Sequence, residues 1–138
     1  MKEILLAYCY IVEAKNVDLT HIGNEIRTYR RFFIEQQIRG TMIYDGEYFI
    51  HLLVGSPLSI VKAEHTMDAL QKGVHKEILY YGKLADAVDG LNPLWQVGYI
   101  LNDQAEAPGY LETLRDSKGN IDAIMTCFQQ LQAISDTV

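Results

Sequence analysis

The sequence contains few residues of the kinds that special folds require. It has 2 cysteines and 3 prolines in 138 residues, and no apolar run approaches the roughly 18 residues of a membrane-spanning helix. Cys9 and Cys127 share no metal-ligand spacing and lie in apolar surroundings. We therefore interpret them as reduced core residues of a cytoplasmic protein. These absences argue against a disulfide-stabilised secreted domain and against a helical membrane protein.

Positive charge is also scarce. The chain has 12 Lys and Arg against 18 Asp and Glu, a net charge of −6, and its longest basic cluster is Arg30-Arg31. Nucleic-acid binding depends largely on neutralising phosphates with Lys and Arg, and anionic membranes attract basic clusters in the same way. We expect neither a nucleic acid nor a membrane surface as the partner.

The chain does contain enough apolar sequence for one folded core. Hydrophobic residues make up 49% of it, and a domain of this length buries roughly two thirds of its unfolded surface. Residues 3 to 11 are rich in Ile, Leu, Tyr and Val and contain no Gly or Pro. They carry Tyr8 and Tyr10 and lack a small-residue cleavage site, so they indicate a buried strand rather than a signal peptide.

Local signals predict the next three elements. Asp18 or Thr20 can cap a helix whose apolar stripe consists of Ile22, Ile26, Tyr29 and Phe33. Two apolar runs then flank Asp45-Gly46, a pair that supplies the positive φ angles of a two-residue type I′ turn. Residues 38 to 54 are therefore predicted to form an antiparallel hairpin.

A second helix and two more strands complete the predicted sheet. Ser56 and Pro57 are typical of the N-cap and first position of a helix, and Gly73 is typical of its end. Residues 78 to 81 predict a fourth strand and residues 82 to 92 a loop. Residues 94 to 101 predict a fifth strand, which follows Pro93 at a position where no ladder donor is needed.

The predicted order is β-α-β-β-α-β with an added fifth strand, which is a ferredoxin-like α+β fold with two helices on one face of a mainly antiparallel sheet. We assign residues 1–102 to this domain, 103–118 to a linker with a possible helical turn at 110–115, and 119–138 to a C-terminal helix. Asn120 is positioned to cap that helix. Its apolar stripe comprises Ile121, Ile124, Met125, Phe128, Leu131 and Ile134. Such a stripe must pack on the open face of the sheet or on another subunit, and we expect it to be an interaction surface.

The residues alone indicate no activity. There is no Gly-rich phosphate loop, no Cys/His zinc spacing and no nucleophile elbow, so we expect neither an enzyme nor a metal site. Tyr8 and Tyr10 share one face of the first strand, and His51 lies on the third strand. A buried Tyr–His hydrogen bond that only satisfies both groups is the simplest prediction. A small enzyme with His51 as general base lacks any partner motif.

Several landmarks, taken in order, resemble the BLUF family of blue-light flavin sensors. The resemblance runs from about residue 3 to residue 101. Its landmarks are Tyr10 in the opening strand, the Asp18-Leu19-Thr20 segment, the stretch from Gln37 to Tyr44, the stretch from Tyr48 to Gly55, His75 before a strand, and Trp95 in the fifth strand.

The resemblance implies a flavin between the two helices, read by a tyrosine on the first strand and a glutamine on the third. It also implies an asparagine late in the first helix, an Arg and an Asp near the end of the second, and a Trp or Met on the fifth strand. Carried over by position, Tyr10, His75 and Trp95 match the family. His51 stands in the glutamine position, Phe33 in the asparagine position, and Lys72 and Val74 replace the Asp and Arg.

These replacements weaken the expected flavin site. An amide both donates and accepts hydrogen bonds, whereas Phe33 can do neither. The sequence therefore predicts a sensory or regulatory domain that acts through a protein partner or a homo-oligomer, with no cofactor. The alternative is a working photoreceptor that binds FAD or FMN in an altered pocket, with His51 in place of the glutamine.

Overall fold

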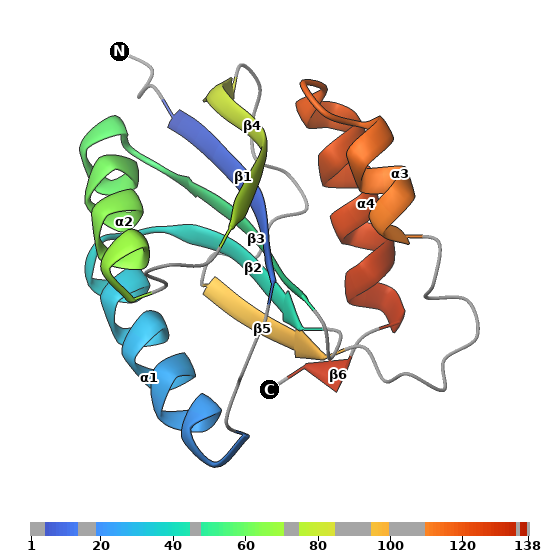
Figure 1. Cartoon of the computed structure of the whole chain (residues 1–138). Coiled ribbons are helices and arrows are strands. Elements are labelled where there is room, and N and C mark those ends of the chain that lie inside the picture. Colours follow the sequence, from blue (N-terminus) through green and yellow to red (C-terminus); the bar gives the residue numbers. More distant parts are fainter. Residues whose placement is uncertain are drawn as a thin grey trace.

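A six-stranded sheet forms the centre of the molecule (Figure 1). The computed structural model describes residues 5–13, 19–44, 48–70, 75–84, 95–99, 110–134 and 136–137. Its strands are β1 (Leu5–Glu13), β2 (Arg39–Tyr44), β3 (Tyr48–Gly55), β4 (Lys76–Leu84), β5 (Trp95–Tyr99) and β6 (Asp136–Thr137). They lie in the order β4-β1-β3-β2-β5-β6. All neighbouring strands are antiparallel except β2 and β5, which are parallel.

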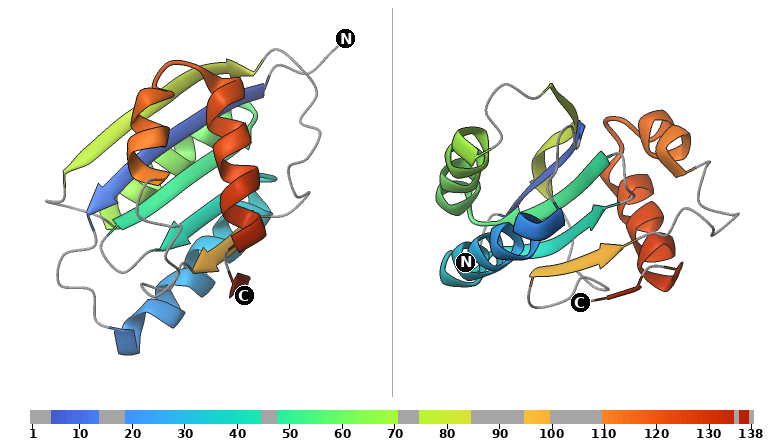
Figure 2. Two further views of the ribbon diagram at one scale, coloured as in Figure 1. Left: turned by 90° about the vertical axis from the view of Figure 1, so that its right-hand side faces the viewer. Right: turned by 60° about the horizontal axis from the view of Figure 1, so that its bottom comes forward.

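Helices cover both faces of the sheet. Helices α1 (Leu19–Glu35) and α2 (Pro57–Leu70) lie on one face, and α3 (Tyr110–Asp116) and α4 (Ile121–Ile134) lie on the other (Figures 1 and 2). The central strands β1, β2 and β3 are consequently buried on both sides, and two separate apolar clusters form. Tyr8 and Tyr10 of β1 belong to the cluster under α1 and α2, whereas Cys9 and Ile11 belong to the cluster under α4. The predicted ferredoxin-like α+β fold, with its alternating first strand, is confirmed.

Two helix starts follow the predicted capping. The Ser56 hydroxyl accepts a hydrogen bond from the Ser59 amide at 3.2 Å, and Asn120 Oδ1 accepts one from the Ala123 amide at 3.2 Å. Each bond satisfies an amide that has no partner inside its own helix. The sequence therefore predicts these two helix starts from local chemistry alone.

The end of α1 follows a different local rule. The Gln37 amide donates to the Ile34 carbonyl at 3.1 Å and the Ile38 amide donates to the Phe33 carbonyl at 2.8 Å. These two bonds form a Schellman motif, which requires a left-handed residue after the helix. Gln37 occupies that position with φ of 56°, although glycine is the usual residue there.

Gly40 fixes the approach of β2 to β3. Its φ is +132°, and a Cβ atom added to it would lie 1.8 Å from the Leu52 carbonyl oxygen. Since no side chain fits there, only glycine allows β2 to pair with β3 in this register, with Gly40 opposite Leu53. This register places Met42 opposite His51.

Three predicted boundaries need correction. The loop expected from residue 82 begins later, because β4 continues to Leu84. The helical turn expected at 110–115 is confirmed as α3, but Leu114 of α3 is fully buried, so this part of the expected linker packs on the domain. The helix expected over 119–138 ends at Ile134, and Asp136–Thr137 instead pairs with β5 as β6. Each correction involves a pairing or packing contact with a distant segment, which local patterns do not report.

Candidate functional site

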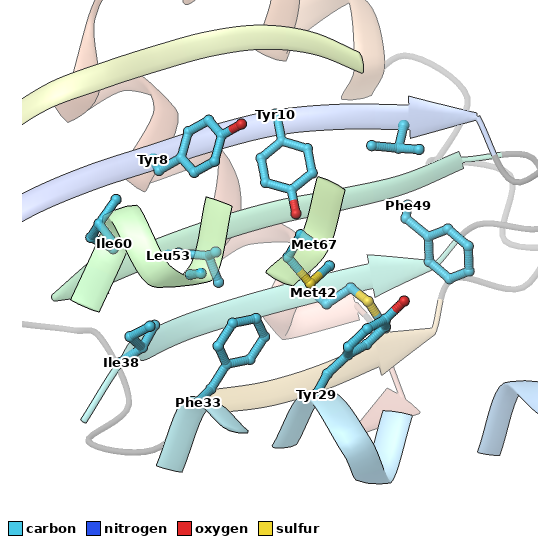
Figure 3. Close-up of a cluster of buried hydrophobic side chains, with 12 residues drawn as sticks. Tyr8, Tyr10, Tyr29, Phe33, Ile38, Met42, Phe49, Leu53, Ile60 and Met67 are labelled. Carbon is cyan, nitrogen blue, oxygen red and sulfur yellow. The ribbon is translucent and has the colours of Figure 1, made fainter. Parts of the chain in front are cut away.

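The groove between the helices α1 and α2 and the sheet is filled with large side chains. Tyr8 and Tyr10 enter it from β1, Phe33 from α1, and Met67 from α2 (Figure 3). All four are fully buried. Other members of this groove cluster are Val12, Tyr29, Ile38, Met42, Phe49, Leu53, Ile60 and Ala63. The region where a ring-shaped ligand would enter is therefore lined mainly by aromatic and thioether groups.

His51 lies at the centre of the groove floor. The sheet register places it opposite Tyr10 on β1 and opposite Met42 on β2, so all three side chains project from the same face. The imidazole stacks on the Tyr10 ring with centroids 4.6 Å apart and planes 14° apart. The predicted meeting of a tyrosine with His51 is thus confirmed, with Tyr10 as the tyrosine.

The predicted Tyr–His hydrogen bond is wrong. Both His51 nitrogens are buried, and neither finds a hydrogen-bond partner in the part of the chain that the structure describes. Parallel rings place the faces of the two groups together, so the ring edges that carry the hydrogen-bonding atoms do not meet. An unsatisfied buried polar atom costs about 1–3 kcal/mol, so the packing around His51 carries an energetic cost.

His51 is uncharged in this environment. Burial lowers the pKa of His51 from 6.5 to about 3, and the positive charge of Lys76 adds to the shift. Burial removes the hydration that stabilises an imidazolium ion, and a nearby cation opposes a second positive charge. At neutral pH His51 therefore has one N–H donor and one acceptor nitrogen.

Lys76, at the start of β4, is the charged residue closest to this centre among the contacts that the structure describes. Its ammonium group donates a hydrogen bond to the Tyr8 hydroxyl at 2.7 Å. The same group lies 5.3 Å from the Tyr8 ring centroid and 5.0 Å from that of Tyr10, which is within the range of cation–π attraction. No sequence motif identified Lys76, because its contact with Tyr8 joins residues 68 positions apart.

A row of tyrosines connects the groove to the surface. The Tyr10 and Tyr8 ring centroids are 4.7 Å apart, and those of Tyr8 and Tyr81 are 4.9 Å apart. Tyr81 is 41% exposed. Burial raises the pKa of Tyr81, as does its hydrogen-bonded neighbour Glu64, so its phenol is neutral at physiological pH.

Phe33 points into the groove. Its ring is fully buried, 5.6 Å from the Phe32 ring centroid and 6.5 Å from that of Tyr29. The sequence left open whether this ring faces the pocket or the sheet. In the structure Phe33 packs in the groove cluster together with Met42 of the sheet floor and Met67 of α2.

The remaining predicted site residues are more dispersed. His75 is exposed and precedes β4, so the described structure does not bring it into the groove cluster. Trp95 begins β5, with its backbone paired to Gly40 of β2. Lys72 and Val74 lie outside the described residues. Val54, in the Tyr48 to Gly55 stretch of the resemblance, is buried in β3.

The C-terminal helix packs on the sheet, which was one of the two predicted alternatives. Ile124 and Phe128 are buried against strand residues, and Ile121 and Met125 pack at the edge of the same cluster. Ile124 and Phe128 therefore contribute to the protein's own core and are not an exposed interface. The side chain of Leu131 lies outside the described part of the helix.

The two cysteines lie in this second cluster, on the face opposite the groove. Both are free and buried. Burial raises the pKa of the Cys9 thiol far above its ordinary value, and Cys127 adds to the shift. Such a thiol is inert at neutral pH, so the prediction of reduced core cysteines agrees with their position.

No group of three or more His, Cys, Asp or Glu side chains is arranged to hold a metal ion within the described ranges. In the same part of the chain, no helix has both the length and the apolar character needed to cross a lipid bilayer.

The chain is similar to solved structures of BLUF proteins. BlrB, a BLUF protein in its dark state, superposes with a TM-score of 0.69 at 15% identity, over 96% of this chain and 99% of that chain. BlsA in its photo-activated state gives a TM-score of 0.66 at 16% identity, over 92% and 94% of the two chains. Klebsiella pneumoniae BlrP1 with FMN and cyclic diGMP gives 0.59 at 12% identity, over 91% of this chain and 34% of that chain. No family model and no curated protein matches the sequence.

These likenesses extend over nearly the whole chain, so the protein is an α+β domain with the fold of a BLUF domain. The identities are low, and they show the fold alone. The function of the groove has to be argued from its own residues.

Proposed function

We propose that this protein is a regulatory domain of BLUF type that acts through protein–protein contacts in the cytoplasm, without enzymatic activity, and in which flavin binding is lost or greatly weakened. BlrP1 has been solved with FMN, so a flavin is the ligand to test against this groove. The observation that carries the proposal is the burial of Phe33 at the position where the BLUF resemblance implies an amide.

The hydrogen-bonding groups of this groove do not fit an isoalloxazine ring well. A flavin carbonyl facing Phe33 would find no donor there, at a cost of about 1–3 kcal/mol for each unsatisfied atom. Phe33 also fills space, because its ring is fully buried among its neighbours. An amide at the same position would both supply a donor and occupy less volume. The aromatic cluster makes the groove stable without a ligand.

A flavin-binding photoreceptor is the second candidate, and one observation favours it. Both His51 nitrogens lack partners among the described residues, and a bound ligand could supply them. Tyr10, stacked on His51, would then remain in place to donate an electron. This alternative accounts for His51 but leaves Phe33 unexplained.

Colour distinguishes the two candidates. The purified protein, refolded with excess FAD or FMN and freed of unbound ligand, is expected to show no flavin absorption in the visible range. A yellow protein whose absorption shifts to the red under blue light would establish the photoreceptor instead. In that case His51→Gln should strengthen the light response, because glutamine restores the amide, and His51→Ala should not.

The protein–protein part of the proposal needs its own measurement. Ile124 and Phe128 are buried internally, so a partner must contact a surface other than these two residues of α4. Light scattering of the intact chain across a concentration series would report self-association. A dimer or larger species supports a homo-oligomeric module. A strictly monomeric chain would restrict the proposal to contacts with a different protein.

A further inference from the structure

We propose that exposed apolar side chains of α2 and β4 form a docking surface for an amphipathic helix of a partner protein, one whose apolar stripe is flanked by acidic residues. This surface, the α2–β4 patch, consists of Leu58 and Val61 of α2 and Ile78 and Tyr81 of β4. The inference rests on the proposed function, because it names the surface and the kind of partner through which that function operates.

The α2–β4 patch contains most of the exposed apolar residues that the structure describes. Five large hydrophobic side chains are exposed in the described part of the chain, each by at least 41%, and four of them belong to the patch. The fifth, Ile34, lies on α1. Single exposed apolar residues are ordinary on a protein surface, whereas several on adjacent elements are typical of interaction sites.

A hydrogen bond shows that α2 and β4 are neighbours at this patch. The Tyr81 hydroxyl donates to the carboxylate of Glu64 on α2. Val61 precedes Glu64 by about one helical turn, and Leu58 precedes Val61 by the same step. Residues three apart are neighbours on a helix surface. The apolar pair of α2 therefore continues along the helix from the point where α2 contacts β4.

A bulge arranges the strand side of the patch. The register of β4 on β1 shifts at Leu79, which is paired with no residue of β1. This extra residue brings Ile78 and Tyr81 to the same face of the sheet, although they are three positions apart. They lie opposite Tyr10 and Tyr8, which belong to the cluster under α1 and α2. Both side chains of β4 are therefore on the α2 side of the sheet.

Lysines flank the apolar pair of β4. The same register places Lys76 and Lys83 on this face, at the two ends of the row, and the Lys83 side chain is exposed. The carboxylate of Glu64 is already hydrogen-bonded to Tyr81. Acidic side chains beside the apolar stripe of a docking helix would face these two ammonium groups. Such complementarity gives an interface its specificity and speeds association.

The backbone of β4 favours a helix over an added strand as the occupant. β4 is the outermost strand of the described sheet (Figure 2), and a pairing strand would use its outer amides and carbonyls. Two of its carbonyls already accept bonds from outside the ladder. The Gly119 amide donates to the Leu79 carbonyl at 2.9 Å, and the Tyr80 hydroxyl donates to the Lys83 carbonyl at 2.6 Å. A helix docks through side chains and leaves these bonds intact.

A second copy of the chain is a poorer occupant than a partner helix. In a two-fold symmetric contact the same patch lies on both sides of the interface. Lys76 and Lys83 of one copy would then meet the lysine-bearing surface of the other, and like charges oppose such a contact. An acidic helix avoids this repulsion.

A fluorescent peptide tests the surface and its charge together. The probe is a synthetic amphipathic helix of about 16 residues with a leucine stripe flanked by glutamates. Fluorescence anisotropy with the full-length protein should show saturable binding that weakens as salt is added. A matched peptide with lysine in place of every glutamate should bind at least about tenfold more weakly. Equal affinities for the two peptides, or no saturable binding of the acidic one, would overturn the proposal.

Substitutions in the protein locate the site. Val61→Glu and Lys83→Glu should each weaken binding of the acidic peptide by at least about tenfold. Both side chains are exposed, so the variants should stay folded, which circular dichroism checks. Ile34→Glu and Arg39→Glu make the same changes at exposed positions outside the patch and should leave the affinity within about twofold. Unchanged binding by the first two variants would place the site elsewhere and disprove the inference.

The remaining outcomes separate this inference from the proposed function. A dimer in light scattering that Val61→Glu converts to a monomer would make the patch an interface between copies, and the partner helix would be wrong. A yellow, flavin-bound protein that still binds the acidic peptide through Val61 and Lys83 would disprove the loss of flavin binding alone. A colourless protein whose peptide binding ignores both substitutions would disprove the docking surface alone.

Discussion

The imidazole of His51 lies almost parallel to the phenol ring of Tyr10, with ring centroids 4.6 Å apart and planes 14° apart. Both side chains are fully buried. The BLUF resemblance implies a tyrosine and a glutamine at these two positions, with hydrogen bonds to a flavin. Here they form an aromatic stack that fills part of the groove, and several consequences can be measured.

The first prediction concerns pH. The pKa of His51 is about 3 in the folded protein and near 6.5 when unfolded, so the unfolded state binds the proton more strongly. Stability from this group is present above pH 6.5 and is lost progressively as pH falls toward 3. Between pH 7 and pH 5 the free energy of unfolding should fall by about 2 kcal/mol from this group.

Urea denaturation of the protein at both pH values measures this change. His51→Gln removes the titrating group and should show a decrease smaller by about 2 kcal/mol. The exposed His65→Gln is the control and should keep the full decrease. Equal decreases in the unchanged protein and in His51→Gln would show that His51 is not buried in its neutral form.

Phe33 provides the second prediction. Phe33→Ala should lower the free energy of unfolding by about 3–5 kcal/mol, because the fully buried ring leaves a cavity. Ile34→Ala on the same turn of α1 should change it by only about 0.5 kcal/mol, since Ile34 is 45% exposed. Similar losses for the two variants, compared by thermal or urea unfolding, would place Phe33 outside the core.

The third prediction compares two glycines with positive φ. Gly40→Ala places a Cβ atom 1.8 Å from the Leu52 carbonyl oxygen, so β2 and β3 must separate and the loss should exceed about 4 kcal/mol. Gly119→Ala meets no atom within 4 Å at φ of +82°. Its cost should be only the left-handed backbone strain, about 1–2 kcal/mol. The ranking of the two melting temperatures checks this difference.

Gln37 is the opposite case, where the sequence departs from the favoured residue. Gln37→Gly relieves the left-handed strain at φ of 56°, and part of that gain is offset by the greater freedom of glycine in the unfolded chain. A stabilisation of up to about 1 kcal/mol is expected. Lower stability of this variant in urea would mean that the Gln37 side chain makes a contact of its own.

Elements governed by nearby residues were predictable from the sequence. Ser56 and Asn120 cap helices through bonds to residues three positions away, and the predicted hairpin forms between β2 and β3. Its register pairs Tyr44 with Phe49, so the expected two-residue turn at Asp45-Gly46, which would pair Tyr44 with Glu47, was wrong. Elements that depend on distant partners were not. The short strand β6 exists through its pairing with β5, and nothing in its two residues, Asp136 and Thr137, indicates a strand.

The same distinction between local and distant contacts applies to the candidate site. The alternation of side chains along each strand correctly placed Tyr10 and His51 on the face of the sheet that lines the groove. Their stacking, and the absence of a hydrogen bond between them, depends on how the rings pack in three dimensions. Lys76 escaped notice because β4 brings it to Tyr8 of β1 only in the folded chain. The pairing register of the strands shows which residues are neighbours in the sheet. The spacing of residues along the sequence does not show this.

The most direct test of a groove filled by its own side chains is a nuclear Overhauser measurement between aromatic protons in the presence of excess FMN. We predict that the cross-peaks between the Tyr10 and His51 rings persist unchanged and that no cross-peak joins either ring to flavin protons. Loss of the Tyr10–His51 cross-peaks together with new contacts from both rings to the flavin would contradict the account.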